Sequence, residues 1–343
     1  FDTQNPPRSL SADSPIFDWI DETLGVDFET GVIDHGLGRV SMLAVRGQPD
    51  VLFNSHLDTV PVIEGSRFPP LELTIDGDKA YGRGSCDIKG AAACLLQVAE
   101  TTDKPMALLF TTDEEGASGI CVAEFVRSEQ CRAFKQVVVT EPTDCLAVSS
   151  HRGYLSVKGE FSGISGHSSE QRALQDNALH KLSSWVAKAV TAAEQMDHIG
   201  RRPCFNVGEV HGGIKSNVIA DMARLHWSAR LSPGDSNKEF LDVMAGLDNS
   251  GSASWHVPFS GPPLPTGGQD TSKAQAFIEQ HGLIAGPVVS FWTEASLFAQ
   301  AGVPAIVLGP GNIAQAHVVD EWVSLQQLER ALGIYTNLVE NHD

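Results

Sequence analysis

Hydrophobic residues in the first part of the chain form short runs of strand length that alternate with segments of helical spacing. The strand-like runs lie at residues 40–45, 51–55, 106–111 and 136–140. Helical spacing of apolar residues occurs at residues 14–24, 90–100 and 120–127. Strands that alternate with helices are typical of a mainly parallel sheet with helices on both faces. We therefore predict an α/β fold for this part of the chain.

The pattern changes after about residue 153. Four strands and two helices are predicted in the order 155–161, 173–195 (helix), 205–210, 224–231, 237–247 (helix) and 253–259. This order is typical of a compact α+β unit. The unit ends at a stretch rich in glycine and proline, residues 261–265. The α/β alternation then resumes, with helices at 271–281 and 296–301, strands at 288–291 and 305–308, and a last helix from about Ser324. We predict one discontinuous domain, 1–153 with 262–343, interrupted by an inserted domain, 154–261.

The composition and net charge of the chain argue against some classes of binding partner. The chain has 343 residues, and 43 acidic against 24 basic side chains give a net charge of −19. Nucleic acids and anionic membranes are polyanions, so neither is expected as a partner. The apolar runs are too short to span a membrane, and no segment has the pattern of a secretory signal. The six cysteines form no C-x-x-C pair, which fits reduced thiols and a cytoplasmic location.

Acidic side chains and a histidine follow the predicted strands. The five residues placed in this way are His56, Asp58, Glu114, Glu115 and Glu141. Functional groups in parallel sheets gather at the carboxyl ends of the strands. Two further residues stand in glycine-rich contexts: Asp87 in a bend before a helix, and His317 beyond a Gly-Pro-Gly loop. We expect these side chains to share one site.

Taken singly, each of these residues has an ordinary structural explanation. Asp87 is suited to cap the helix that follows it, and Glu114 and Glu115 are suited to solvent at a strand end. His317 is one of twelve histidines. Together, however, several carboxylates at the ends of buried strands would repel one another, and divalent cations remove that cost. The mixed nitrogen and oxygen donors favour zinc, cobalt or manganese over calcium or magnesium. The set predicts metal-assisted hydrolysis of an amide.

These segments resemble those of the dinuclear-zinc amidohydrolases, which include acetylornithine deacetylase, succinyl-diaminopimelate desuccinylase, aminoacylases and glutamate carboxypeptidases. The resemblance covers nearly the whole chain and rests on His56-x-Asp58, Asp87-Ile88-Lys89-Gly90, Glu114-Glu115, Glu141-Pro142-Thr143, Gly166-His167-Ser168-Ser169 and His317. Residues 291–295, and residues 309–311 with 315–317, are similar to the acetylornithine deacetylase branch. Residues 1–8, 86–90 and 213–217 look closer to acetylcitrulline deacetylase.

The resemblance implies two divalent metal ions, zinc first and cobalt or manganese as alternatives. The implied roles are a bridging Asp87, His56 and Glu141 at one metal, Glu115 and His317 at the other, Asp58 orienting His56, and Glu114 as general base. It further implies a cis peptide bond between Asp87 and Ile88. The inserted domain is implied to be a ferredoxin-like lid through which a homodimer forms, with His167 of the partner subunit as oxyanion donor.

The same resemblance implies an N-acyl amino acid substrate. The carboxylate of such a substrate requires arginine or amide donors. We expect Arg230 to bind it, with Asn217 beside it, and Arg152 is a weaker candidate. Each of the three could equally be an ordinary surface residue. Glu294 either faces a cationic substrate side chain or simply begins a helix. An inward-pointing Lys215 would disfavour such a cation.

The implied activity is removal of acetate from N2-acetylornithine or N-acetylcitrulline in arginine biosynthesis. A broader aminoacylase, a desuccinylase and a dipeptidase of the same family remain alternatives. A metal-binding or peptide-binding module without catalysis is a further alternative, and the intact Glu114 argues against it.

Overall fold

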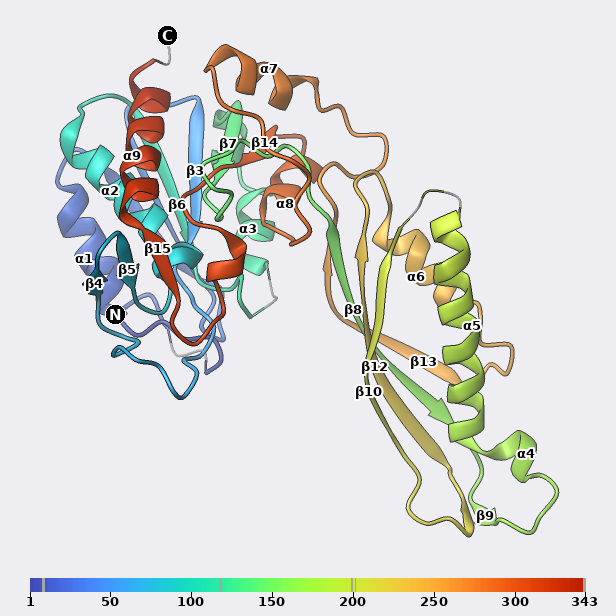
Figure 1. Ribbon diagram of the computed structural model, residues 1–343. Coiled ribbons are helices and arrows are strands. Elements are labelled where there is room, and N and C mark those ends of the chain that lie inside the picture. Colours follow the sequence, from blue (N-terminus) through green and yellow to red (C-terminus); the bar gives the residue numbers. More distant parts are fainter. Residues whose placement is uncertain (8–9, 117–118, 199, 201, 342–343) are drawn as a thin grey trace. The chain divides into compact units, whose positions relative to one another are not determined.

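A computed structural model describes residues 1–7, 10–116, 119–198, 200 and 202–341 (Figure 1). The chain forms two compact units: a first unit of Phe1–Ser149, Asp270–Val288 and Thr293–Asp343, and a second of Ser150–Gln269 and Val289–Trp292. Their limits differ by a few residues from the predicted 153/154 and 261/262. His151 and Leu264 exchange two backbone hydrogen bonds, of 2.9 and 3.1 Å, and so attach both flanking segments to the second unit.

A six-stranded sheet forms the centre of the first unit. Its order is β1 (Glu29–Asp34), β2 (Val40–Arg46), β6 (Met106–Thr111), β3 (Val51–His56), β7 (Gln136–Val139) and β14 (Ala305–Val307). The last four strands in this order are parallel to one another, and β1 and β2 form an antiparallel edge. Every residue of β3, β6, β7 and β14 is buried, as apolar runs in a covered parallel sheet should be. The predicted mainly parallel α/β fold is confirmed. We did not predict β1, whose side chains are all exposed and give no apolar alternation.

Helices cover both faces of this sheet (Figure 1). One group of helices consists of α1 (Pro15–Leu24), α2 (Gly90–Thr101) and α9 (Leu325–Glu340). Another group consists of α3 (Ile120–Phe125) and α8 (Ala295–Gln300). The unit also contains α7 (Ser272–Gln280) and a 3-10 turn, η2 (Gln130–Ala133). The main core includes Phe17, Leu95 and Tyr335, and the Tyr335 hydroxyl donates to the Leu308 carbonyl over 2.8 Å. A small sheet, in the order β15 (Trp322–Ser324), β5 (Lys79–Tyr81) and β4 (Thr74–Asp76), joins the C-terminal segment to the chain just before Asp87.

The second unit has the β-α-β-β-α-β order of ferredoxin-like folds. Its elements are β8 (Gly153–Ser162), α5 (Ala178–His198), β10 (Cys204–Gly212), β12 (Met222–Leu231), α6 (Asn237–Ala245) and β13 (Ala253–Gly261), with the short α4 (Ala173–Asp176), β9 (Gly166–His167) and β11 (Val218–Ile219). The antiparallel sheet has the order β10-β12-β8-β13 and packs through Trp185 and Trp227 against its helices. No helix among the described residues combines the length and apolar character that crossing a membrane requires.

Two predicted elements of this part of the chain differ from the structure. The helix predicted at 173–195 is interrupted at Asn177, whose ψ of 116° is extended. The strand predicted at 288–291 is wrong, because only Val289 makes a single bridge, to His151. Val289–Trp292 belong to the second unit, where the Trp292 ring packs on Phe259 with 4.9 Å between centroids. Their apolar side chains therefore reflect packing in that unit and not a strand of the large sheet.

Candidate metal centre

The carboxylate of Asp87 lies between two imidazoles that come from distant parts of the first unit. Its Oδ1 is 2.9 Å from Nε2 of His56, and its Oδ2 is 3.2 Å from Nε2 of His317. His56 ends β3, whereas His317 follows the 3-10 turn η3 (Ile313–Gln315). Each oxygen of one carboxylate thus faces a different nitrogen donor, which is the arrangement that a residue bridging two cations requires.

Two glutamates complete the group around Asp87. Glu141, directly after β7 and Thr140, places Oε1 3.6 Å from Nε2 of His56. Glu115, in the loop after β6, places Oε1 3.0 Å from Nε2 of His317. One donor atom each from His56, Asp87 and Glu115 lie within 4.8 Å of one another. The structure therefore brings all five predicted ligands together at the carboxyl ends of β3, β6 and β7.

Asp58 connects His56 to its surroundings. Nδ1 of His56 is 2.8 Å from the backbone carbonyl of Asp58 and 3.6 Å from its Oδ1, so the nearer partner is the carbonyl and not the predicted carboxylate. Oδ2 of Asp58 accepts hydrogen bonds from Nδ2 of Asn5, at 2.7 Å, and from the backbone N–H of Glu115, at 3.1 Å. Asp58 thereby ties the His56 segment to the loop that carries Glu115.

The loop before His317 is held in place by its own polar side chains. Asn312 and Gln315 form a reciprocal capping box around η3. Gly311 has a φ of 88°, and a Cβ atom there would lie 2.5 Å from Sγ of Cys86, so this close approach requires glycine. His317 has a φ of 58°, in the left-handed region that non-glycine residues seldom adopt. These features place its ring beside Asp87 and Glu115.

The bend that carries Asp87 contains the cis peptide bond Asp87–Ile88, as the resemblance implied. Three residues that were not predicted support the cluster from outside: Asn5 binds Asp58, Glu321 binds the backbone N–H of Asp87, and Arg83 binds Glu321. Asn5 stands inside a segment on which the resemblance rests, and Arg83 lies in the glycine-rich stretch just before Asp87, so these positions are the signals that could have pointed to them. Glu321 precedes a short strand and carries no such signal.

The charges in the cluster favour cation binding. Burial raises the pKa of Glu114 well above its usual range, and the charge of Glu141 raises it further. Burial likewise raises the pKa of Glu141, and Asp87 adds to it. Hydrogen bonds to Asp87 and Glu115 raise the pKa of His317 to about 10. Acids so crowded are stabilised in their charged form by a nearby cation. The imidazole and carboxylate donors therefore fit divalent ions of the zinc, cobalt or manganese type.

The other predicted site residues are placed as follows. Glu294, the N-cap residue of α8, is 1% exposed, and its Oε2 accepts hydrogen bonds from Asn54 (2.6 Å) and Thr111 (3.1 Å). Buried between strands, it fits the prediction of a helix-start acid better than that of a substrate contact.

The remaining five predicted residues, His167, Arg152, Lys215, Asn217 and Arg230, belong to the second unit. His167 is exposed, and its Nδ1 shares a 2.8 Å hydrogen bond with Oγ of Ser169. Arg152 donates to the backbone carbonyls of Arg202 (2.7 Å) and Arg230 (3.3 Å). The guanidinium of Arg230 lies 3.9 Å above the ring of Tyr154. Lys215 and Asn217 lie in the loop between β10 and β11, where Asn217 accepts a backbone hydrogen bond from Ser168 (3.1 Å).

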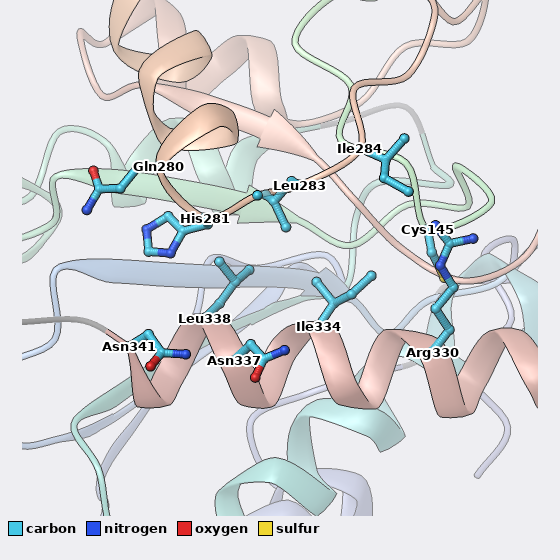
Figure 2. A pocket seen from close by; sticks show the side chains of 11 residues that line it. Cys145, Gln280, His281, Leu283, Ile284, Arg330, Ile334, Asn337, Leu338 and Asn341 are labelled. Carbon is cyan, nitrogen blue, oxygen red and sulfur yellow. The ribbon is translucent and has the colours of Figure 1, made fainter.

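A cavity of about 430 Å³ lies elsewhere in the first unit, between α9 and the segment after α7 (Figure 2). Ile334 and Leu338 of α9 face Leu283, and Arg330 extends toward Cys145 at one end (Figure 2). None of the residues that line it is a predicted site residue. This cavity is therefore not part of the carboxylate and histidine cluster.

Comparison with known proteins places these features in a family. The family described as Peptidase family M20/M25/M40 matches residues 52–341. An N-acetyl-L-citrulline deacetylase of Xanthomonas campestris pv. campestris is 41% identical over 343 residues, covering 96% of this chain and 92% of that protein. An acetylornithine deacetylase of Vibrio vulnificus is 29% identical over 351 residues, covering 95% and 89%. A solved M20 family metallo-carboxypeptidase of Sulfolobus solfataricus has a TM-score of 0.69 at 16% identity, covering 95% and 92%, and so shares the fold.

Proposed function

Because the chain belongs to peptidase family M20/M25/M40, we propose that it is a metal-dependent deacetylase of N-acetyl amino acids whose preferred substrate is N-acetylcitrulline. Asp87 carries this proposal, since its two oxygens each face a different histidine in a cluster rich in carboxylates. The 41% identity to an N-acetyl-L-citrulline deacetylase over nearly the whole chain supports the choice of substrate.

We assign two divalent cations to the cluster, zinc first, with cobalt or manganese as alternatives. Asp87 would bridge them, His56 and Glu141 would hold one, and Glu115 and His317 would hold the other. Bound cations of this kind polarise an acyl carbonyl and lower the pKa of water toward neutrality. The 3.0 and 3.6 Å contacts of the two glutamates with the two histidines support this division of ligands.

Glu114 is the proposed general base. It is adjacent in sequence to Glu115, and its carboxylate would take a proton from the attacking water and deliver it to the departing amine. A base that works near neutral pH needs a pKa above that of an ordinary carboxylate. Burial and the charge of Glu141 both act in that direction.

The second unit would supply the groups that recognise the substrate. We propose that His167 of a partner subunit donates to the oxyanion, and that Arg230 and Asn217 bind the α-carboxylate. Arg152 ranks below Arg230, because two backbone carbonyls already accept its hydrogen bonds. A homodimer formed through this unit, acting as a lid, belongs to the same proposal and rests on the family resemblance.

The choice between the two substrates depends on charge. The side chain of acetylornithine ends in an ammonium group, whereas that of acetylcitrulline ends in a neutral carbamoyl group. Glu294 is buried and bound by Asn54, so it is a poor candidate for pairing with an ammonium. An exposed Lys215 would repel that group if it faced the substrate. Both reactions supply amino acids for arginine biosynthesis.

The cysteines support a location of the protein in the reducing cytoplasm. Five of the six are buried, and none of them forms a disulfide.

A metal and substrate assay tests the proposal. Chelator-stripped protein should lose activity, regain it with zinc, cobalt or manganese, and bind two ions per chain by elemental analysis. With the ions restored, kcat/KM should be at least about tenfold higher for N-acetylcitrulline than for N2-acetylornithine, which is about 1.4 kcal/mol in transition-state binding. Faster turnover of acetylornithine would overturn the substrate choice. Equal turnover of succinylated substrates or dipeptides would replace it with a broader hydrolase.

A further inference from the structure

Glu321 is a buried carboxylate that holds the backbone of the Asp87 bend. It is 3% exposed. Its Oε1 accepts from the backbone N–H groups of Cys86 and Asp87, each at 3.0 Å, and its Oε2 accepts from the N–H of Gly84 at 3.0 Å. A carboxylate that accepts several backbone N–H groups fixes the course of the chain around it. The peptide group of Asp87 is therefore set directly by a residue far away in the sequence.

Arg83 connects the same carboxylate to the segment that carries His317. Nη1 of Arg83 contacts Oε2 of Glu321 at 2.5 Å, and its Nη2 donates to the backbone carbonyl of Val318 at 3.2 Å. Val318 is the residue after His317. The backbone N–H of Gly82 also donates to the carbonyl of Glu321, at 3.1 Å. One buried ion pair thus contacts the backbone on both sides of the contact between Asp87 and His317.

We infer that Arg83 and Glu321 are positioning residues that set the spacing between Asp87 and His317, and so control how tightly the second cation binds. This inference rests on the proposed function, in which those two residues and Glu115 hold that cation. The first cation depends less on the pair, because His56 ends strand β3 of the large sheet and Glu141 lies shortly after strand β7. Residues that orient metal ligands typically change affinity by about 10- to 100-fold when they are replaced.

Cation titration of the whole 343-residue chain, freed of metal with a chelator, tests the inference. The variant Glu321→Gln replaces one acceptor oxygen with an NH₂ group, which faces backbone N–H donors. Arg83→Lys keeps the positive charge and loses the planar fork that reaches both Glu321 and Val318. In isothermal titration with zinc, and in the visible spectrum with cobalt, both variants should keep the first binding step. Their second step should weaken by about 10- to 100-fold.

A neighbouring ion pair provides the matched control. Asp320 pairs with Arg67 at 2.7 Å, but the Arg67 side chain is 67% exposed, and the Asp320 carboxylate accepts its hydrogen bonds from Ser66 and Arg67. Asp320→Asn removes the same charge one position away and should leave both binding steps unchanged. Circular dichroism and an intact first binding step show that a variant is folded. If Glu321→Gln does not fold, Arg83→Lys alone tests the inference. Two wild-type steps in the folded variants would overturn the inference. A wild-type protein that binds no cation would instead overturn the proposed function.

Discussion

Asn5 donates a hydrogen bond from Nδ2 to Oδ2 of Asp58 over 2.7 Å, and both side chains are buried. The other oxygen of Asp58 lies 3.6 Å from Nδ1 of His56. The N-terminal segment therefore reaches the candidate metal centre through this carboxylate, and Thr3 and Asn5 also bind the backbone of Leu57 and Thr59 on either side of Asp58. Because a buried carboxylate is costly without its donors, this contact both stabilises the fold and fixes a residue beside a metal ligand.

Replacing Asn5 with alanine should weaken cation binding. The variant leaves one oxygen of Asp58 with only the Glu115 amide as donor, and we expect about a tenfold loss of zinc affinity together with a loss of about 1.5–3 kcal/mol of stability. Zinc titration and urea unfolding measure the two effects. Asp2→Ala, an exposed change three positions away, is the control. Identical zinc affinity in Asn5→Ala and Asp2→Ala would show that Asn5 does not support the site.

Replacing Glu114 with glutamine should separate catalysis from metal binding. The amide cannot accept the proton of water, so kcat should fall by about 10²- to 10⁴-fold while the cation content stays unchanged. The adjacent Glu115→Gln is the matched comparison, because it should reduce cation content as well as turnover. Elemental analysis and initial rates distinguish the two variants. Retained turnover in Glu114→Gln would exclude it as the general base.

Glu294 should make stability depend on pH. Burial, and then the charge of Asp113, raise its pKa to about 7, against an ordinary value of 4.5. Between these values the folded state holds more protons than the unfolded state, so the free energy of unfolding falls as the pH rises. The loss from pH 4.5 to above pH 7 amounts to at most about 3 kcal/mol.

The variant Glu294→Gln tests this dependence, because glutamine keeps a carbonyl acceptor for Asn54 and Thr111 and does not titrate. Its unfolding free energy in urea should fall less steeply between pH 5 and pH 8 than that of the wild type. Glu329→Gln, which changes an exposed acid on α9, should follow the wild type. A Glu294→Gln variant with the wild-type slope would contradict the assignment.

Replacing His167 with alanine should affect kcat more than KM. An oxyanion donor acts mainly in the transition state, and its loss typically reduces kcat by about 10²- to 10³-fold. The residue is exposed, so the change should leave the second unit folded. His211→Ala on β10, another exposed histidine of that unit, should have wild-type kinetics. Equal kinetics in both variants would remove His167 from the mechanism.

The apolar runs of the parallel strands and the acids behind them were predictable because both are local features. Burial on two faces requires continuous apolar residues in β3, β6 and β7, and a charge directly after such a run must lie at the edge of the sheet. His56 and Glu141 could therefore be selected from the sequence. His317 was also predicted, first from its position beyond a Gly-Pro-Gly loop and then from the family resemblance.

Tertiary structure decided the contacts between distant segments. The sequence by itself determined which residues carry donors and acceptors and which strands they follow, because alternation and burial act over a few residues. Only the folded chain brought Glu321 to the amide of Asp87, placed Glu294 between strands beside Asn54, and moved residues 289–292 into the second unit. Those outcomes depend on contacts between segments that are distant in the sequence. The local periodicity of apolar residues does not determine which distant segment a buried carboxylate or an apolar run will contact.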